Sequence, residues 1–104
     1  MTGGNRGRAL LLAQRWPGPR LGAPPKYLGS KECEAWHLIV AATPDVLRAI
    51  DEPGLACTAS ILERWRSGER EPGLLRLAYR MLGDCFVPMR ERRRLLFPDR
   101  PPRR

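Results

Sequence analysis

The chain has 104 residues and a net charge of +8 at pH 7, so it has room for one domain and an excess of positive charge. No apolar run approaches the roughly 20 residues that a membrane-spanning helix needs, and we expect no membrane partner. Glycine and proline are dense in the first 29 residues, and proline again near the end. We therefore expect a flexible arm at 1–29, a folded domain at 30–96 and a disordered tail at 97–104.

The positive charge is concentrated in the two ends of the chain. Residues 1–29 carry five basic groups and no acid, which gives +5. Residues 30–87 carry seven basic and nine acidic groups (−2), and residues 88–104 carry seven arginines and two acids (+5). Basic ends around a nearly neutral domain suit a polyanion such as nucleic acid. Seventeen of the nineteen basic residues are arginine, which a GC-rich genome alone could also produce.

The cysteine and histidine content argues against a metal site. Cys33, Cys57 and Cys85 lie 24 and 28 residues apart, without a Cys-x-x-Cys pair, and His37 is the only histidine. No signal peptide is evident, so we expect free thiols in a reducing cytoplasm. A domain of about 60 residues without disulfides or metals is marginally stable by itself, which favours self-association.

Caps and apolar spacing predict an all-α domain of four to five short helices. Ser30 is the expected N-cap of the first helix, which continues to residue 42. Within it, Trp36, Ile39 and Val40 follow one another at helical spacing. No segment shows the alternating pattern of a strand.

Proline and glycine indicate where the later helices begin and end. Thr43 and Pro44 predict a short second helix that ends near residue 51. A third helix is expected from residue 51 to about 66, a fourth from Glu71 to about 85, and a short basic turn or helix over 89–96. The residues expected to lie in the core or at a subunit interface share the apolar faces of these helices: Trp36, Ile39, Val40, Leu62, Trp65, Leu74, Leu77, Ala78 and Met81.

Arginines after Pro88 are the first candidates for phosphate contacts. They are Arg90, Arg92, Arg93 and Arg94, of which the first and the last two would share one face of a helix. The alternative interpretation is that these arginines lie on a frayed chain end and contact only solvent. A second set of DNA-binding candidates lies in the arm: Arg6, Arg8, Arg15, Arg20 and Lys26. Also in the arm, Trp16 could stack on a base or dock on a neighbouring subunit.

The sequence shows no pattern typical of a catalytic site. His37 has no nucleophile partner at helical spacing, and no glycine loop precedes a helix as in phosphate-binding proteins. No serine stands in a G-x-S-x-G context. Helix capping explains the acidic pair Asp51 and Glu52. We therefore expect a binding protein, not an enzyme, without metal or cofactor.

Three stretches of the chain carry a family resemblance. They are Pro24 to Ser30 (PPKYLGS) with the tryptophan helix after it, the short segment from Leu47 to Asp51 ahead of a longer helix, and the proline-then-arginine stretch from Pro88 to Leu95. Together they resemble the small-subunit family of tailed-bacteriophage terminases. The resemblance implies a ring-shaped homo-oligomer in the cytoplasm of a bacterial host. It would recognise double-stranded viral DNA and recruit or regulate the terminase large subunit, which carries the ATPase and nuclease.

The same sequence also fits two other classes of protein. One is a dimeric helix-turn-helix regulator built on the third and fourth helices. The fourth helix, however, begins with Glu71, Pro72 and Gly73, a poor set of side chains for base edges or phosphates. The other class is a helical adaptor that binds proteins and not DNA, for which the arginines would be a compositional accident.

Overall fold

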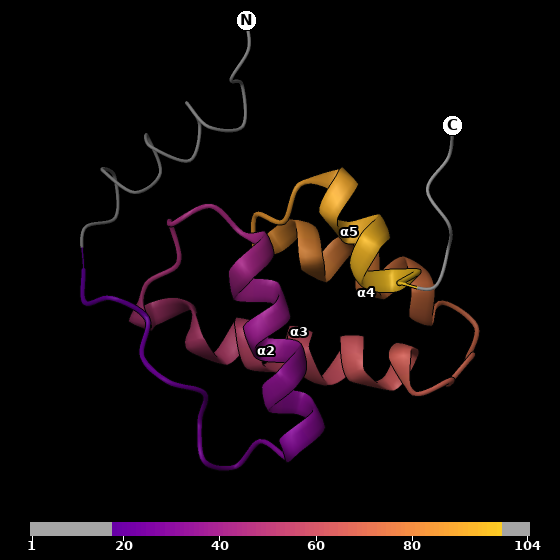
Figure 1. The fold of residues 1–104 in the computed structure, drawn as a ribbon, viewed down its shortest axis with the longest axis horizontal. Coiled ribbons are helices and arrows are strands. Elements are labelled where there is room, and N and C mark those ends of the chain that lie inside the picture. Colours follow the sequence, from indigo (N-terminus) through magenta and orange to yellow (C-terminus); the bar gives the residue numbers. More distant parts are fainter. Residues whose placement is uncertain (1–17, 99–104) are drawn as a thin grey trace, which may run out of the picture.

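The computed structural model describes residues 18–98, and Figure 1 shows their arrangement. They form α2 (Ser30–Ala42), the 3-10 helix η1 (Ala49–Asp51), α3 (Glu52–Arg66), α4 (Leu74–Asp84) and α5 (Met89–Leu96). The prediction of an all-α domain is confirmed for this part of the chain. Its one β pairing is an isolated bridge between Arg20 and Arg48, and no helix in it is long and apolar enough to cross a membrane.

Helix α3 is the central element of the fold. It packs against α2, η1, α4 and α5, and Figure 1 shows α2 crossing it. Leu55 and Leu62 on α3 are fully buried, together with Trp36 of α2 and Leu82 of α4. Removing these large apolar side chains from water is the main driving force for the fold.

Helix α2 begins one residue earlier than predicted, because Gly29 and not Ser30 is its N-cap. The Gly29 N–H donates a hydrogen bond to Glu32 Oε1 at 2.9 Å, and the Ser60 hydroxyl of α3 donates to Glu32 Oε2 at 2.6 Å. These two bonds, that from Ser60 above all, hold the pKa of Glu32 below its ordinary value. One carboxylate therefore closes the first turn of α2 and ties it to α3.

The predicted second helix, over residues 43–51, is wrong except for its last turn. Thr43 ends α2, since its hydroxyl donates to the Ile39 carbonyl at 2.7 Å. The Ala49 N–H donates to the Pro19 carbonyl at 2.9 Å, so residues 19–20 lie beside residues 48–49. Residues 43–48 form a turn and this isolated bridge instead, so pairing with a distant segment takes the place of helical hydrogen bonds there.

Helix α4 begins at Leu74, three residues after the predicted start at Glu71. Gly73 adopts a φ of +84°, a left-handed conformation that interrupts a regular helix. The Leu74 N–H closes a turn on the Glu71 carbonyl at 3.0 Å instead. The side chain of Glu71 pairs with Arg64 of α3 at 3.2 Å, which links this turn to the preceding helix.

The residues predicted for the core differ in burial. The structure buries six of them: Trp36, Ile39, Leu62, Trp65, Leu74 and Ala78. Val40 and Met81 are half-buried. Leu77 is 39% exposed and lies outside the core, because the buried row of α4 runs through Leu74, Ala78 and Leu82 at intervals of four residues. Phe97, predicted to belong to the unstructured tail, packs against the core and meets the Trp65 ring edge-on at 5.9 Å.

Candidate nucleic-acid interface

The turn between α4 and α5 determines where α5 begins. Phe86 has a φ of +65°, the one non-glycine residue with positive φ in the described chain. Its N–H donates to the Gly83 carbonyl at 2.9 Å, and the Val87 N–H donates to the Leu82 carbonyl at 3.0 Å. These are the two hydrogen bonds of a Schellman motif. Val87 is fully buried, which offsets the cost of a left-handed phenylalanine, and the chain is directed back over the core.

The inner face of α5 is attached to the end of α3. Leu95 and Leu96 are buried, and their carbonyls are among those at a helix C-terminus that lack partners within the helix. Two side chains from α3 donate hydrogen bonds to these carbonyls. Trp65 Nε1 donates to the Leu96 carbonyl at 2.7 Å, and Arg66 donates to the Leu95 carbonyl at 2.7 Å. Helix α5 is thus held at its C-terminal end by hydrogen bonds as well as by apolar packing.

Arg92, a sequence candidate for phosphate contact, points toward the body of the protein. Its Nε donates to the Val87 carbonyl at 2.7 Å, and the side chain is half-buried. The guanidinium lies against Gly83, where an added Cβ would be 3.0 Å from Cζ. The residue therefore joins the first turns of α5 to the end of α4. A phosphate contact by this guanidinium would compete with that structural role.

The other three arginines of α5 form an outward surface, which we call the α5 arginine face. It consists of Arg90, Arg93 and Arg94, all exposed. Their spacing of three and four residues places them on the side of the helix opposite the buried leucines, as the sequence predicted. Arg94 has a weak contact with Glu91 at 3.7 Å. Arg93 and Arg94 lie in the last turn, where positive charge complements the helix dipole.

Of the candidates from the N-terminal arm, the two that the structure describes do not join this surface. Arg6, Arg8 and Arg15 lie outside the described residues. Arg20 and Lys26 are exposed in the segment that precedes α2, which Figure 1 shows on the far side of α2 and α3 from α5. The basic surfaces that the structure describes are therefore separate.

Arginines near the end of α3 have structural roles that no sequence pattern indicated. The Arg70 guanidinium stacks over the Trp65 ring, with Cζ 3.8 Å from its centroid, and donates to the Trp65 carbonyl at 2.8 Å. Arg64 pairs with Glu69, which raises the pKa of Arg64 and lowers that of Glu69. A spacing of five residues across the end of α3 is not a helical contact spacing, so the sequence carried no signal for the stacking. The role of Arg66 depends on a contact about 30 positions away, which spacing cannot reveal.

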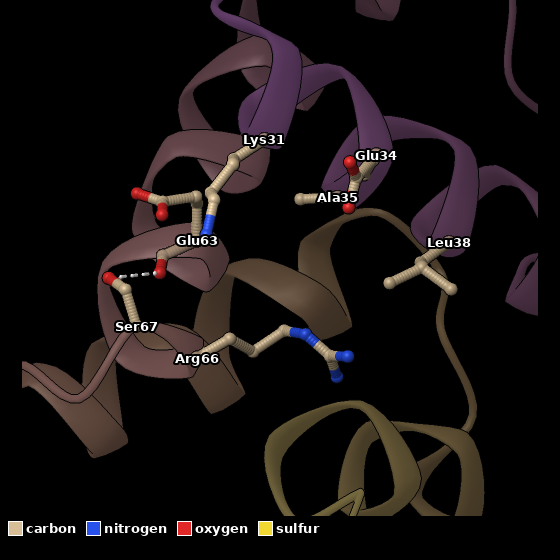
Figure 2. A pocket seen from close by; sticks show the side chains of 7 residues that line it. All are labelled: Lys31, Glu34, Ala35, Leu38, Glu63, Arg66 and Ser67. Atoms are coloured by element: carbon tan, nitrogen blue, oxygen red, sulfur yellow. Dashed lines mark hydrogen bonds between the residues drawn. The ribbon is translucent and has the colours of Figure 1, made fainter.

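A shallow pocket of about 180 Å³ lies between α2 and α3, beside α5. Figure 2 shows Lys31 reaching from α2 toward Glu63 of α3, while Arg66 extends toward α5. Glu34 lies on the α2 side, so basic and acidic groups alternate around the opening. This mixed charge does not favour an anion, and the pocket is not part of the α5 arginine face.

The α5 arginine face offers three guanidinium groups on a helix that is held at both ends. A guanidinium can donate two parallel hydrogen bonds to one phosphate, so the arrangement suits a polyphosphate backbone. The described residues contain no cluster of three or more His, Cys, Asp or Glu side chains able to hold a metal ion. Comparison of the chain with protein-family models, curated proteins and solved structures finds no match.

Proposed function

We propose that this protein is a non-catalytic DNA-binding component of a phage genome-packaging machine, of the terminase small-subunit type. It would bind double-stranded viral DNA, self-associate into a ring and recruit or regulate the large ATPase-nuclease subunit. The observation that supports this most is the α5 arginine face. It lies within the proline-then-arginine stretch that resembles the closing element of the family, and its three arginines point away from the core.

The attachment of α5 supports phosphate binding by this face. A side chain on an ordered helix loses less conformational freedom on binding than one on a disordered tail. Trp65 and Arg66 donate to carbonyls at the C-terminal end of α5, and Arg92 donates to the Val87 carbonyl in the turn before it. None of the outward arginines takes part in these hydrogen bonds. Each phosphate they neutralise would release counterions, which makes binding fall steeply with salt.

Exposed apolar side chains support self-association. Leu77 on α4 and Met89 on α5 are 39% and 48% exposed, although both are large and hydrophobic. Apolar side chains left exposed on the protomer are available for contacts between subunits. In a closed ring every copy would present the same arginine face, and the repetition would turn weak individual contacts into tight binding.

Two measurements on the purified chain test the proposal. Light scattering gives the mass in solution, and titration of a fluorescent duplex over a range of salt concentrations gives DNA affinity and its salt dependence. The proposal predicts an assembly larger than a dimer that binds duplex DNA with a steep negative salt slope. A dimer selective for a palindromic site would indicate a helix-turn-helix regulator, and an assembly indifferent to DNA would indicate an adaptor; either result contradicts the proposal.

A further inference from the structure

A groove of about 260 Å³ lies on another part of the surface, between η1, α3 and α4. Its apolar lining includes Leu55 of α3, Met81 of α4 and Ile50 of η1. Ile50 is 82% exposed, the largest exposed fraction among the large hydrophobic residues that the structure describes. Ile50 shares this groove with the apolar side chains of Leu55 and Met81, and an exposed apolar side chain at such a groove suits a binding partner.

The rim of the groove is acidic. Asp51 from η1 and Asp84 from α4 both line it, and one oxygen of Asp51 accepts the Arg48 N–H at 2.8 Å. Cys85, a buried residue, also lines the groove, and its thiol hydrogen-bonds the Thr58 hydroxyl. Burial raises the pKa of that thiol, and the negative charges of the two aspartates raise it further. The groove therefore suits a segment that combines an apolar side chain with a positive charge.

The described chain begins next to this groove. The Pro19 carbonyl accepts the Ala49 N–H at 2.9 Å, and Ala49 is followed directly by Ile50 and Asp51. In Figure 1 the first described residues pass close to the start of α3. Trp16 lies three residues before Pro19 in sequence, a span of up to about 10 Å for an extended chain. It is preceded by Arg15 and by the leucines at positions 10–12.

We propose that the groove binds residues 10–16 of the same chain, with the Trp16 ring against Ile50 and Arg15 beside the two aspartates. Tryptophan supplies a large apolar surface, which the exposed isoleucine needs. The short connection keeps the local concentration of this segment high, which favours binding within one chain over binding between copies. The interaction is independent of DNA binding and of the proposed function.

Isoleucine methyl NMR on the full chain tests this directly. The chain has three isoleucines, so a sample labelled with ¹³C at the Ile δ1 methyls gives one reporter in the groove and two elsewhere. Ile39 is fully buried against α3, and Ile61 lies outside the groove lining. Trp16→Ala removes the ring current and should shift the Ile50 resonance while leaving Ile39 and Ile61 in place. The control Tyr27→Ala, which removes a 72% exposed ring, should leave all three unchanged.

The Ile50 resonance in three samples tests whether residues 10–16 of the same chain bind the groove. An Ile50 resonance that does not move in Trp16→Ala overturns the proposal. The variant Asp84→Asn should move Ile50 part of the way toward its Trp16→Ala position, because a favourable charge is lost. Finally, labelled Trp16→Ala is mixed with an excess of unlabelled wild type: no change supports binding within one chain. Recovery of the wild-type Ile50 shift would mean that a neighbouring copy supplies the segment, which contradicts the proposal.

Discussion

The two faces of α5 contain the same kind of residue in opposite roles. On the inner face, Arg92 donates to a backbone carbonyl, beside the buried Leu95 and Leu96. On the outer face, Arg90 and Arg93 are exposed. All of these residues belong to one run of eight, so composition and charge do not distinguish them. Position around the helix decides which arginine contributes to stability and which is free to bind a partner.

The inner and outer faces of α5 should respond differently to substitution. Changes on the inner face should lower the free energy of unfolding, because they remove contacts between α5 and the body. Changes on the outer face should leave folding intact and alter binding alone.

The largest effect on stability is expected from Trp65→Ala. The change removes a buried ring, its hydrogen bond to the Leu96 carbonyl and its contacts with Phe97 and Arg70. We expect a loss of about 3–5 kcal/mol in the free energy of unfolding, measured by urea denaturation. Trp65→Phe is the matched control: it keeps an aromatic ring and leaves the Leu96 carbonyl without its donor, at a cost of about 1–3 kcal/mol. A Trp65→Ala protein as stable as wild type would contradict the attachment of α5 to α3.

Arg92→Ala should destabilise the protein by a smaller amount. The side chain is half-buried, and its hydrogen bond to the Val87 carbonyl is worth about 1–2 kcal/mol after allowance for solvent. Arg93→Ala removes an exposed arginine of the same helix and should change stability by no more than about 0.5 kcal/mol. Equal melting temperatures for the two variants would show that the inner and outer faces of α5 do not differ.

The smallest expected effect comes from Glu32, which joins α2 to α3 and makes the stability of the protein depend on pH in the acid range. The pKa of Glu32 in the folded protein lies below its ordinary value, so its contribution is fully present above that value and is lost as the pH falls through the lowered one. Ser60→Ala removes the main cause of the shift. The variant should melt lower than wild type at pH 7, and the difference should shrink as Glu32 is protonated. A difference that persists unchanged at low pH would contradict this.

The sequence predicted those parts of the fold that depend on local signals. The third helix, expected from residue 51 to about 66, agrees with α3 at Glu52–Arg66, and the outward position of Arg90, Arg93 and Arg94 followed from helical spacing. The parts of the fold that the sequence did not predict depend on contacts between distant residues. Most of the predicted second helix is absent because residues 48–49 pair with residues 19–20.

Helical spacing already places Arg92 on the inner side of α5, because it stands three and four residues before Leu95 and Leu96. Its hydrogen bond to the Val87 carbonyl and its contact with Gly83 depend on the turn at Phe86, which has no signal in the arginine pattern. The start of α4 depends likewise on the left-handed conformation of Gly73. A glycine at this position is itself a local signal that a helix is interrupted there. Local rules thus assign the elements, and the packing between them assigns the roles of individual arginines.

The salt dependence of duplex binding by the triple variant Arg90→Gln, Arg93→Gln and Arg94→Gln tests the central claim most directly. If all three arginines contact phosphates, the slope of log affinity against log salt should become shallower by about 2.7, at about 0.9 per contact, while the unfolding free energy stays within about 0.5 kcal/mol of wild type. Arg92→Gln should instead lower stability and keep the slope. A triple variant with the slope of wild type would contradict the assignment of the α5 arginine face to DNA.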